Sequence, residues 1–123
     1  MLEILNPILS KSDNIKLILI GTGELEEQVK NKVKSMKINN KVIFLGPKKN
    51  VSEYYQVMDL FILPSIFEGL PIVGIEAQAS GLKCIFSDNI TKEVDITGNS
   101  IFISISDQEK WRKTIYAIKE KGY

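Results

Sequence analysis

Two glutamates in the middle of the chain, Glu68 and Glu76, are the side chains whose type and spacing could do chemistry. Glu68 lies in the loop of residues 65–70, and Pro71 suits the first position of a helix because its missing N–H costs nothing there. Helical side chains lean toward the helix N-terminus, so Glu76 is expected to point toward the same pocket as Glu68. Carboxylates accept hydrogen bonds, and the natural donors for this pair are sugar or ribose hydroxyls.

The turn between the two glutamates predicts an anion site. Its free backbone amides, together with the helix dipole, favour a group such as a diphosphate. The amides in question are those of Gly69, Leu70, Ile72 and Val73. The glycine lets a ligand approach the backbone closely. An acidic residue near a helix N-terminus also complements the dipole, so Glu76 alone is compatible with a solvated surface position.

Strands and helices alternate along the whole chain. Short apolar runs predict strands at residues 15–20, 42–45, 60–63, 82–86 and 101–105. Amphipathic or capped segments predict helices within 1–12, where Pro7 shortens or kinks the helix, and at 24–36, 52–57, 71–80 and from Asp107 onward. This alternation predicts one α/β domain over residues 1–123, a Rossmann-like parallel sheet with helices on both faces. Ligands bind such sheets at the carboxyl ends of the strands.

Three details complete the predicted elements. Gly81 suits the position just past the end of the helix over residues 71–80. Trp111, Ile115 and Ile118 are expected to face inward from the last helix. Cys84, within an apolar strand, is expected to be a small core residue.

The composition excludes several classes of site. The chain has no histidine and one cysteine, so a Ser-His-Asp triad, a Cys-His pair, an internal disulfide and the usual zinc sites are ruled out. A formal charge of +1 gives no electrostatic case for nucleic acid or an acidic membrane surface. No apolar run is long enough to cross a bilayer, and a cytoplasmic location is the default expectation.

Residues 65–77, Ser-Ile-Phe-Glu-Gly-Leu-Pro-Ile-Val-Gly-Ile-Glu-Ala, resemble the Glu-x7-Glu signature of retaining glycosyltransferases of the GT-B fold, family 4. The flanking segments 59–65 and 76–81 resemble the strand before that motif and the helix after it. Further agreement lies at residues 18–23, 42–46, 85–88 and 93–94. The similarity covers residues 15–118 in order, which makes it far more specific than two glutamates alone.

The resemblance implies a role for each matching residue. Glu76 would hold the ribose of the donor nucleotide, and Glu68 would contact the transferred sugar and orient its anomeric carbon. The diphosphate would lie against the backbone of Gly69, Leu70, Pro71, Ile72 and Val73, and the base against the loop of Gly46, Lys48 and Val51. Such enzymes take a nucleotide sugar, such as a UDP- or GDP-sugar, transfer it with retention of configuration, and need no metal.

The chain departs from the family pattern at its start. The family's Arg and Lys, which neutralise the diphosphate, lie in a segment before residue 1, and the acceptor-binding N-terminal domain is absent. The sequence therefore resembles the C-terminal half of a GT-B fold. We expect weak donor binding and no transfer by the chain alone. The full-length enzyme would take a sugar or lipid-linked acceptor in cell-surface polysaccharide synthesis, in the cytoplasm or peripherally at the inner membrane face.

Three other classes of protein share parts of this pattern. A GT-B-like sugar-nucleotide epimerase would also bind a nucleotide sugar, and would convert it without an acceptor. A response-regulator receiver has this length and layering, but it requires an acidic cluster at the strand ends, where this chain has Gly21, Gly46 and Pro64. A degenerate domain kept for protein contacts would bind no nucleotide.

Overall fold

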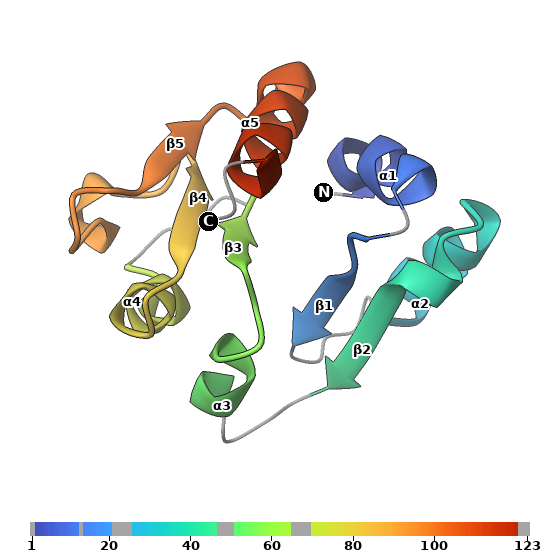
Figure 1. The fold of residues 1–123 in the computed structure, drawn as a ribbon, viewed down its shortest axis with the longest axis horizontal. Helices are drawn as coiled ribbons and strands as arrows, with labels where there is room; N and C mark the ends of the chain where they lie inside the picture. The colour runs from blue at the N-terminus through green and yellow to red at the C-terminus, as the bar shows by residue number, and fades with distance from the viewer. Residues whose placement is uncertain (1, 13, 21–25, 47–50, 65–69, 121–123) are drawn as a thin grey trace. The chain divides into compact units, whose positions relative to one another are not determined.

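The computed structural model describes residues 2–12, 14–20, 26–46, 51–64 and 70–120 (Figure 1). The chain forms two compact units, Met1–Val51 and Ser52–Tyr123. The strands pair in two sheets, β1-β2 in the first unit and β3-β4-β5 in the second, and each strand pair of the described residues is parallel. The expected α/β class with parallel strands is thereby confirmed.

The first unit is built on a two-stranded sheet. Its elements are α1 (Leu2–Lys11), β1 (Leu17–Ile20), α2 (Glu26–Ser35), the 3-10 helix η1 (Asn39–Lys41) and β2 (Val42–Gly46). Leu17 lies opposite Val42, and the register shifts between Leu19 and Ile20, so that Ile20 lies opposite Gly46. Helix α1 includes Pro7 and still runs ten residues, with Ile4, Leu5, Ile8 and Leu9 buried on one stripe. Burial of that stripe offsets the hydrogen bond that the proline cannot make.

Helix α2 is followed by a lysine with left-handed backbone, two residues after Ser35. Lys37 has a φ of 60°, its N–H donates to the carbonyl of Lys34, and the N–H of Ile38 donates to the carbonyl of Val33. This pair of bonds is the Schellman motif, and the buried side chains of Val33 and Ile38 supply the apolar contact that accompanies it.

The second unit carries a three-stranded sheet (Figure 1). Its elements are α3 (Val51–Tyr55, which begins at the last residue of the first unit), β3 (Leu60–Leu63), α4 (Ile72–Ala79), β4 (Lys83–Ser87), the 3-10 helix η2 (Lys92–Val94), β5 (Ile101–Ile103) and α5 (Gln108–Glu120). Strand β4 is central, with Leu60 opposite Lys83 and Ile85 opposite Ile101. Because all three strands are parallel, their carboxyl ends share one edge of the sheet.

Aromatic side chains run across this sheet in a row. Tyr55 meets Phe61 edge-on at 6.1 Å between ring centroids. Phe61 then lies 6.3 Å from Phe86, which lies 5.6 Å from Phe102. The row joins α3 to all three strands, and Phe86, one of its two inner rings, is fully buried. Contacts of this kind add to the burial of apolar area.

Helix α5 packs through the side chains that the sequence predicted. Trp111 and Ile115 are buried, and Ile118 is half-buried. The indole Nε1 of Trp111 donates to the carbonyl of Ser104 at 3.0 Å, so the one polar atom of this ring is satisfied in the core. None of the helices in the described part of the chain is long and apolar enough to span a membrane.

Candidate functional site

Helix α4 starts at the carboxyl edge of the β3-β4-β5 sheet, and no side chain caps its first backbone amides. Pro71 is its N-cap, with extended backbone and no side-chain cap hydrogen bond. The first amide of the turn to find a carbonyl is that of Gly74, which donates to Pro71 at 3.0 Å. The amides of Ile72 and Val73 precede it, so they lack intrahelical acceptors. The helix begins one residue later than predicted, and of the four predicted free amides those of Ile72 and Val73 lie in this first turn.

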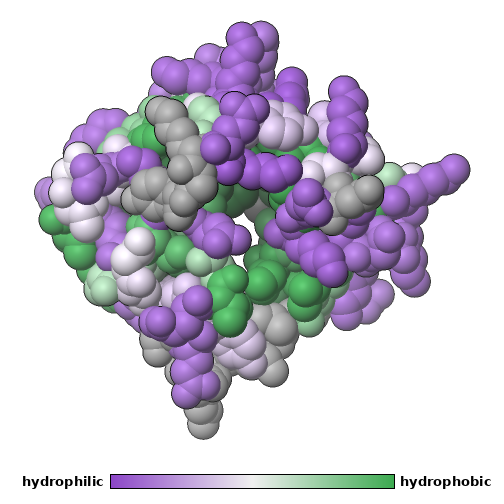
Figure 2. Space-filling view, in the orientation of Figure 1, coloured by the Kyte–Doolittle hydropathy of each residue, from purple (hydrophilic) through white to green (hydrophobic). Residues whose placement is uncertain are grey.

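The side chains around this turn are apolar and open to solvent. Hydrophilic side chains cover much of the visible surface (Figure 2). Against that background the exposed fractions of Leu70, Ile72 and Val73 are 43%, 66% and 41%. Three of the six large apolar side chains exposed within the described ranges therefore surround one short turn. Such clustering on a small protein marks a binding surface more often than scattered apolar residues do.

Glu76 stands on α4 just after that turn, with an exposed side chain. Its predicted partner Glu68, together with Gly69 and Lys48, lies outside the described residues, so the pairing of the two glutamates stays a prediction. Gly46 ends β2, and Val51 begins α3. Both belong to the first unit, whereas α4 belongs to the second, and the predicted contact of this loop with the base also stays a prediction.

Gly74 sets the distance between α4 and the sheet. A Cβ atom at this position would lie 2.7 Å and 2.9 Å from ring atoms of Phe86 and 3.1 Å from Cγ2 of Val94. The first two distances are shorter than side chains tolerate, so this approach requires glycine. The sequence analysis did not single out Gly74, although a glycine inside a helix is a known signal of close packing.

Gln78 ties the other end of α4 to the segment after η2. Its side chain is 4% exposed, and its Nε2 donates to the carbonyls of Gly74 at 3.0 Å and Val94 at 2.6 Å. Its Oε1 accepts from the amides of Ile96 at 3.0 Å and Thr97 at 3.3 Å, and from the Thr97 hydroxyl at 3.4 Å. A buried amide with both ends satisfied holds these two segments in register. In the sequence, the only indication of this role of Gln78 is that it is a polar residue within an otherwise apolar helix.

Tyr55 contacts the first turn of α4 from α3. The phenol donates to the carbonyl of Val73 at 3.3 Å, and the residue is 3% exposed. Burial, followed by the negative charge of Glu76, raises the pKa of Tyr55. The phenol therefore stays protonated, and able to donate, at neutral pH.

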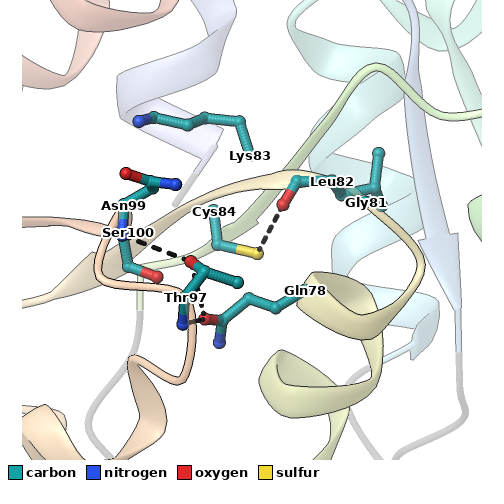
Figure 3. Close-up of a pocket in the computed structure, with 8 residues that line it drawn as sticks. All are labelled: Gln78, Gly81, Leu82, Lys83, Cys84, Thr97, Asn99 and Ser100. Atoms are coloured by element: carbon teal, nitrogen blue, oxygen red, sulfur yellow. Dashed lines mark hydrogen bonds between the residues drawn. The ribbon is translucent and has the colours of Figure 1, made fainter.

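A cavity of about 210 Å³ lies at the opposite edge of the same sheet (Figure 3). Its lining residues are Gln78, Gly81, Leu82, Lys83, Cys84, Thr97, Asn99 and Ser100, at the amino ends of β4 and β5. The Cys84 thiol faces the Leu82 carbonyl at 3.6 Å. Burial, then the charge of Asp95, raises the pKa of Cys84 to about 12, as expected of a core thiol. Ligands of parallel sheets bind at the carboxyl ends, so this cavity is not the predicted site.

The described residues contain no group of three Cys, Asp or Glu side chains close enough to hold a metal ion. Within the described residues, the start of α4 offers backbone amides and the Glu76 carboxylate. This combination suits a ligand with an anionic part and a hydroxyl-bearing part.

Comparison with known families decides between the classes of protein that share this architecture. Residues 1–120 match the family described as Glycosyl transferases group 1. The chain belongs to this family. This match favours neither a receiver module nor an epimerase.

Proteins similar in sequence to this glycosyltransferase family member are themselves named as glycosyltransferases. It is 39% identical over 103 residues to the Bacillus subtilis (strain 168) protein named "Putative glycosyltransferase EpsF", covering 81% of this chain and 27% of that protein. It is 32% identical over 87 residues to the Escherichia coli UDP-Gal:alpha-D-GlcNAc-diphosphoundecaprenol alpha-1,3-galactosyltransferase, covering 70% of this chain and 21% of that one. The chain thus spans about a quarter of the length of such relatives.

Solved structures confirm the fold of this family member. TarM superimposes with a TM-score of 0.84 at 17% identity, over 94% of this chain and 24% of that one. Anabaena Alr3699/HepE in complex with UDP-glucose gives 0.81 at 18% identity, over 98% and 35%. At these identities the neighbours show the fold alone, and it agrees with the α/β class expected from the sequence.

Proposed function

We propose that this chain is the nucleotide-sugar-binding part of a glycosyltransferase, with the donor at the start of α4. The observation that carries the proposal is the uncapped first turn of α4, whose free amides lie at the carboxyl edge of a parallel sheet. The donor class is supported by two proteins similar to this one. HepE is solved with UDP-glucose, and the Escherichia coli relative is named for UDP-Gal. A UDP-sugar is therefore the first donor to test.

Each residue has a proposed task. The amides of Ile72 and Val73, with Gly69, Leu70 and Pro71 beside them, hold the diphosphate, while Glu76 accepts hydrogen bonds from the ribose. Fixed amides also stabilise the charge that develops on the leaving diphosphate, and they need no reorganisation during the reaction. Glu68 contacts the transferred sugar. The base lies against Gly46, Lys48 and Val51.

The complete enzyme is proposed to be a retaining, family 4 transferase that needs no metal. It acts on a sugar or lipid-linked acceptor in cell-surface polysaccharide synthesis, in the cytoplasm or peripherally on the inner membrane face. The names of relatives support this pathway class, since one is an amylovoran biosynthesis glycosyltransferase and another a Vi polysaccharide biosynthesis protein. Because this chain spans about a quarter of such proteins, we expect it to bind donor weakly and to transfer nothing alone.

Ligand-observed NMR of this chain with UDP, GDP, ADP and UDP-sugars tests the donor site. Saturable binding of one nucleotide is expected, and Glu76→Ala should weaken it about tenfold, because a carboxylate hydrogen-bonded to two hydroxyls contributes roughly that much. Glu120→Ala, which removes an exposed carboxylate at the end of α5, is the control and should bind like the parent. Folded protein that binds every nucleotide equally well with and without Glu76 would contradict the assignment.

A further inference from the structure

The first turn of α4 is anchored at its start by the fully buried Pro71 side chain, but its next two side chains are exposed. Pro71 supplies no side-chain cap, and the side chains of Ile72 and Val73 extend into solvent. The helix is eight residues long, which is too short to be stable by propensity alone. Tertiary contacts must therefore fix the direction in which the free amides point.

Among the described residues of the second unit, Phe86 and Tyr55 both contact this turn, in addition to Val94 beside Gly74. Gly74 rests against the Phe86 ring from the sheet side. Tyr55 approaches from α3, and its hydroxyl donates to the carbonyl of Val73 at 3.3 Å. The first contact sets the height of the helix above the sheet. The second is directional, so it resists rotation of the turn about the helix axis.

Tyr55 is itself held rigidly enough for this task. Its side chain is 3% exposed, and its ring meets Phe61 edge-on at an interplanar angle of 83°. Phe61 continues into the buried aromatic row over β3, β4 and β5. The hydroxyl that reaches Val73 is thus carried by a ring fixed to the sheet, whose rotamer cannot change without disturbing the core.

We propose that Tyr55 is a positioning residue for the donor site, whose hydroxyl orients the first turn of α4 so that the amides of Ile72 and Val73 face the diphosphate. The proposal rests on the proposed function for the identity of the ligand. The negative charge of Glu76, the carboxylate assigned to the ribose, is after burial the second cause of the raised pKa of Tyr55. Tyr55 touches no ligand in this scheme. It acts through the backbone of Val73.

Tyr55→Phe tests the structural half of the proposal without any ligand. The substitution keeps the ring and its contact with Phe61, and removes only the hydroxyl. Amide hydrogen exchange followed by NMR should show faster exchange at Gly74 and shifted amide resonances at Ile72 and Val73, with the β4 amides unchanged. Tyr54→Phe, on the same helix and half-buried, is the matched control and should leave this turn as it is. An unaltered first turn in Tyr55→Phe would overturn the proposal.

Binding of UDP and of uridine then tests the functional half. If the hydroxyl aims the amides at phosphate, Tyr55→Phe should weaken UDP about fivefold, the size of one net hydrogen bond, and leave uridine nearly unchanged. An equal loss for UDP and uridine, or no loss for either, would show that Tyr55 serves only the fold. Failure of the unaltered chain to bind UDP would instead reject the proposed function, while the exchange measurement still decides whether Tyr55 holds the turn.

Discussion

The environment of Cys84 decides whether the only thiol of the chain is reactive. Its sulfur lines a cavity, yet the residue is 1% exposed and its thiol faces the Leu82 carbonyl. Burial and the charge of Asp95 both disfavour the thiolate, which is the nucleophilic form. A cysteine in a cavity wall is therefore no sign of covalent chemistry here.

Cys84 should also make the stability of the protein fall at alkaline pH. The thiol pKa is raised from 9.0 to about 12, so the folded state holds its proton where the unfolded chain has released it. The stabilising contribution is complete below pH 9 and is lost as the pH rises toward 12, by about 1.4 kcal/mol per unit. Urea unfolding at pH 8 and pH 10 should show a larger loss for the parent than for Cys84→Ala. Equal losses would contradict the raised pKa.

At the scale of the element, two helices end in the same hydrogen-bonded cap with different residues. Gly81 follows α4 with a φ of 91°, and its N–H and that of Leu82 donate to the carbonyls of Gln78 and Ala77. Lys37 occupies the equivalent position after α2, with a φ of 60°. Left-handed backbone is comfortable for glycine and costly for lysine.

Reciprocal substitutions at these caps should change stability in opposite directions. Lys37→Gly should raise the free energy of unfolding, and Gly81→Ala should lower it, each by about 1 kcal/mol. Nothing lies within 4 Å of a Cβ added at Gly81, so the backbone conformation alone is tested there. Urea denaturation of both variants is the measurement. A stabilising Gly81→Ala would show that the cap is not left-handed.

Packing of α4 on the sheet should be sensitive to a single added methyl group. Gly74→Ala places a Cβ under 3 Å from the Phe86 ring, and we expect a loss of roughly 1–3 kcal/mol despite the better helix propensity of alanine. The cost should shrink in a Phe86→Leu background, because the smaller side chain vacates the contact. A double-mutant cycle in urea measures both. If the losses of unfolding free energy in the two single variants simply add in the double variant, the contact with the Phe86 ring is not the source of the strain.

The helices and strands that are bounded by proline or glycine were predictable from the sequence. Strand β3 stops before Pro64, and α4 lies between Pro71 and Gly81, because these residues restrict the backbone locally. Helix α1 was less predictable, since the tertiary burial of its apolar stripe outweighs Pro7. The roles of Tyr55 and Gln78 arise from contacts with segments eighteen or nineteen positions away, as from Tyr55 to Val73 and from Gln78 to Thr97. No local pattern encodes such contacts.

At the scale of the whole chain, some predictions from the sequence are confirmed and others stay predictions. Membership of a glycosyltransferase family followed from the order and spacing of several segments, and the match over residues 1–120 bears it out, whereas retention of configuration and family 4 stay proposals. The extent of the domain, residues 1–123, and the pairing of Glu68 with Glu76 stay predictions, because Glu68 lies outside the described residues. Motif spacing identifies both glutamates, but it does not fix the distance between their carboxylates, which depends on the backbone of the loop before α4.

The single tryptophan gives the protein an intrinsic optical label. Trp111 is fully buried in the second unit, with its indole nitrogen bonded to Ser104. The wavelength of its emission maximum therefore reports the hydration of that core alone. The far-ultraviolet circular dichroism signal, in contrast, has contributions from the helices of both units. Following both signals through one denaturation would show whether the two units melt as one body or in succession, with no dye attached and no residue changed.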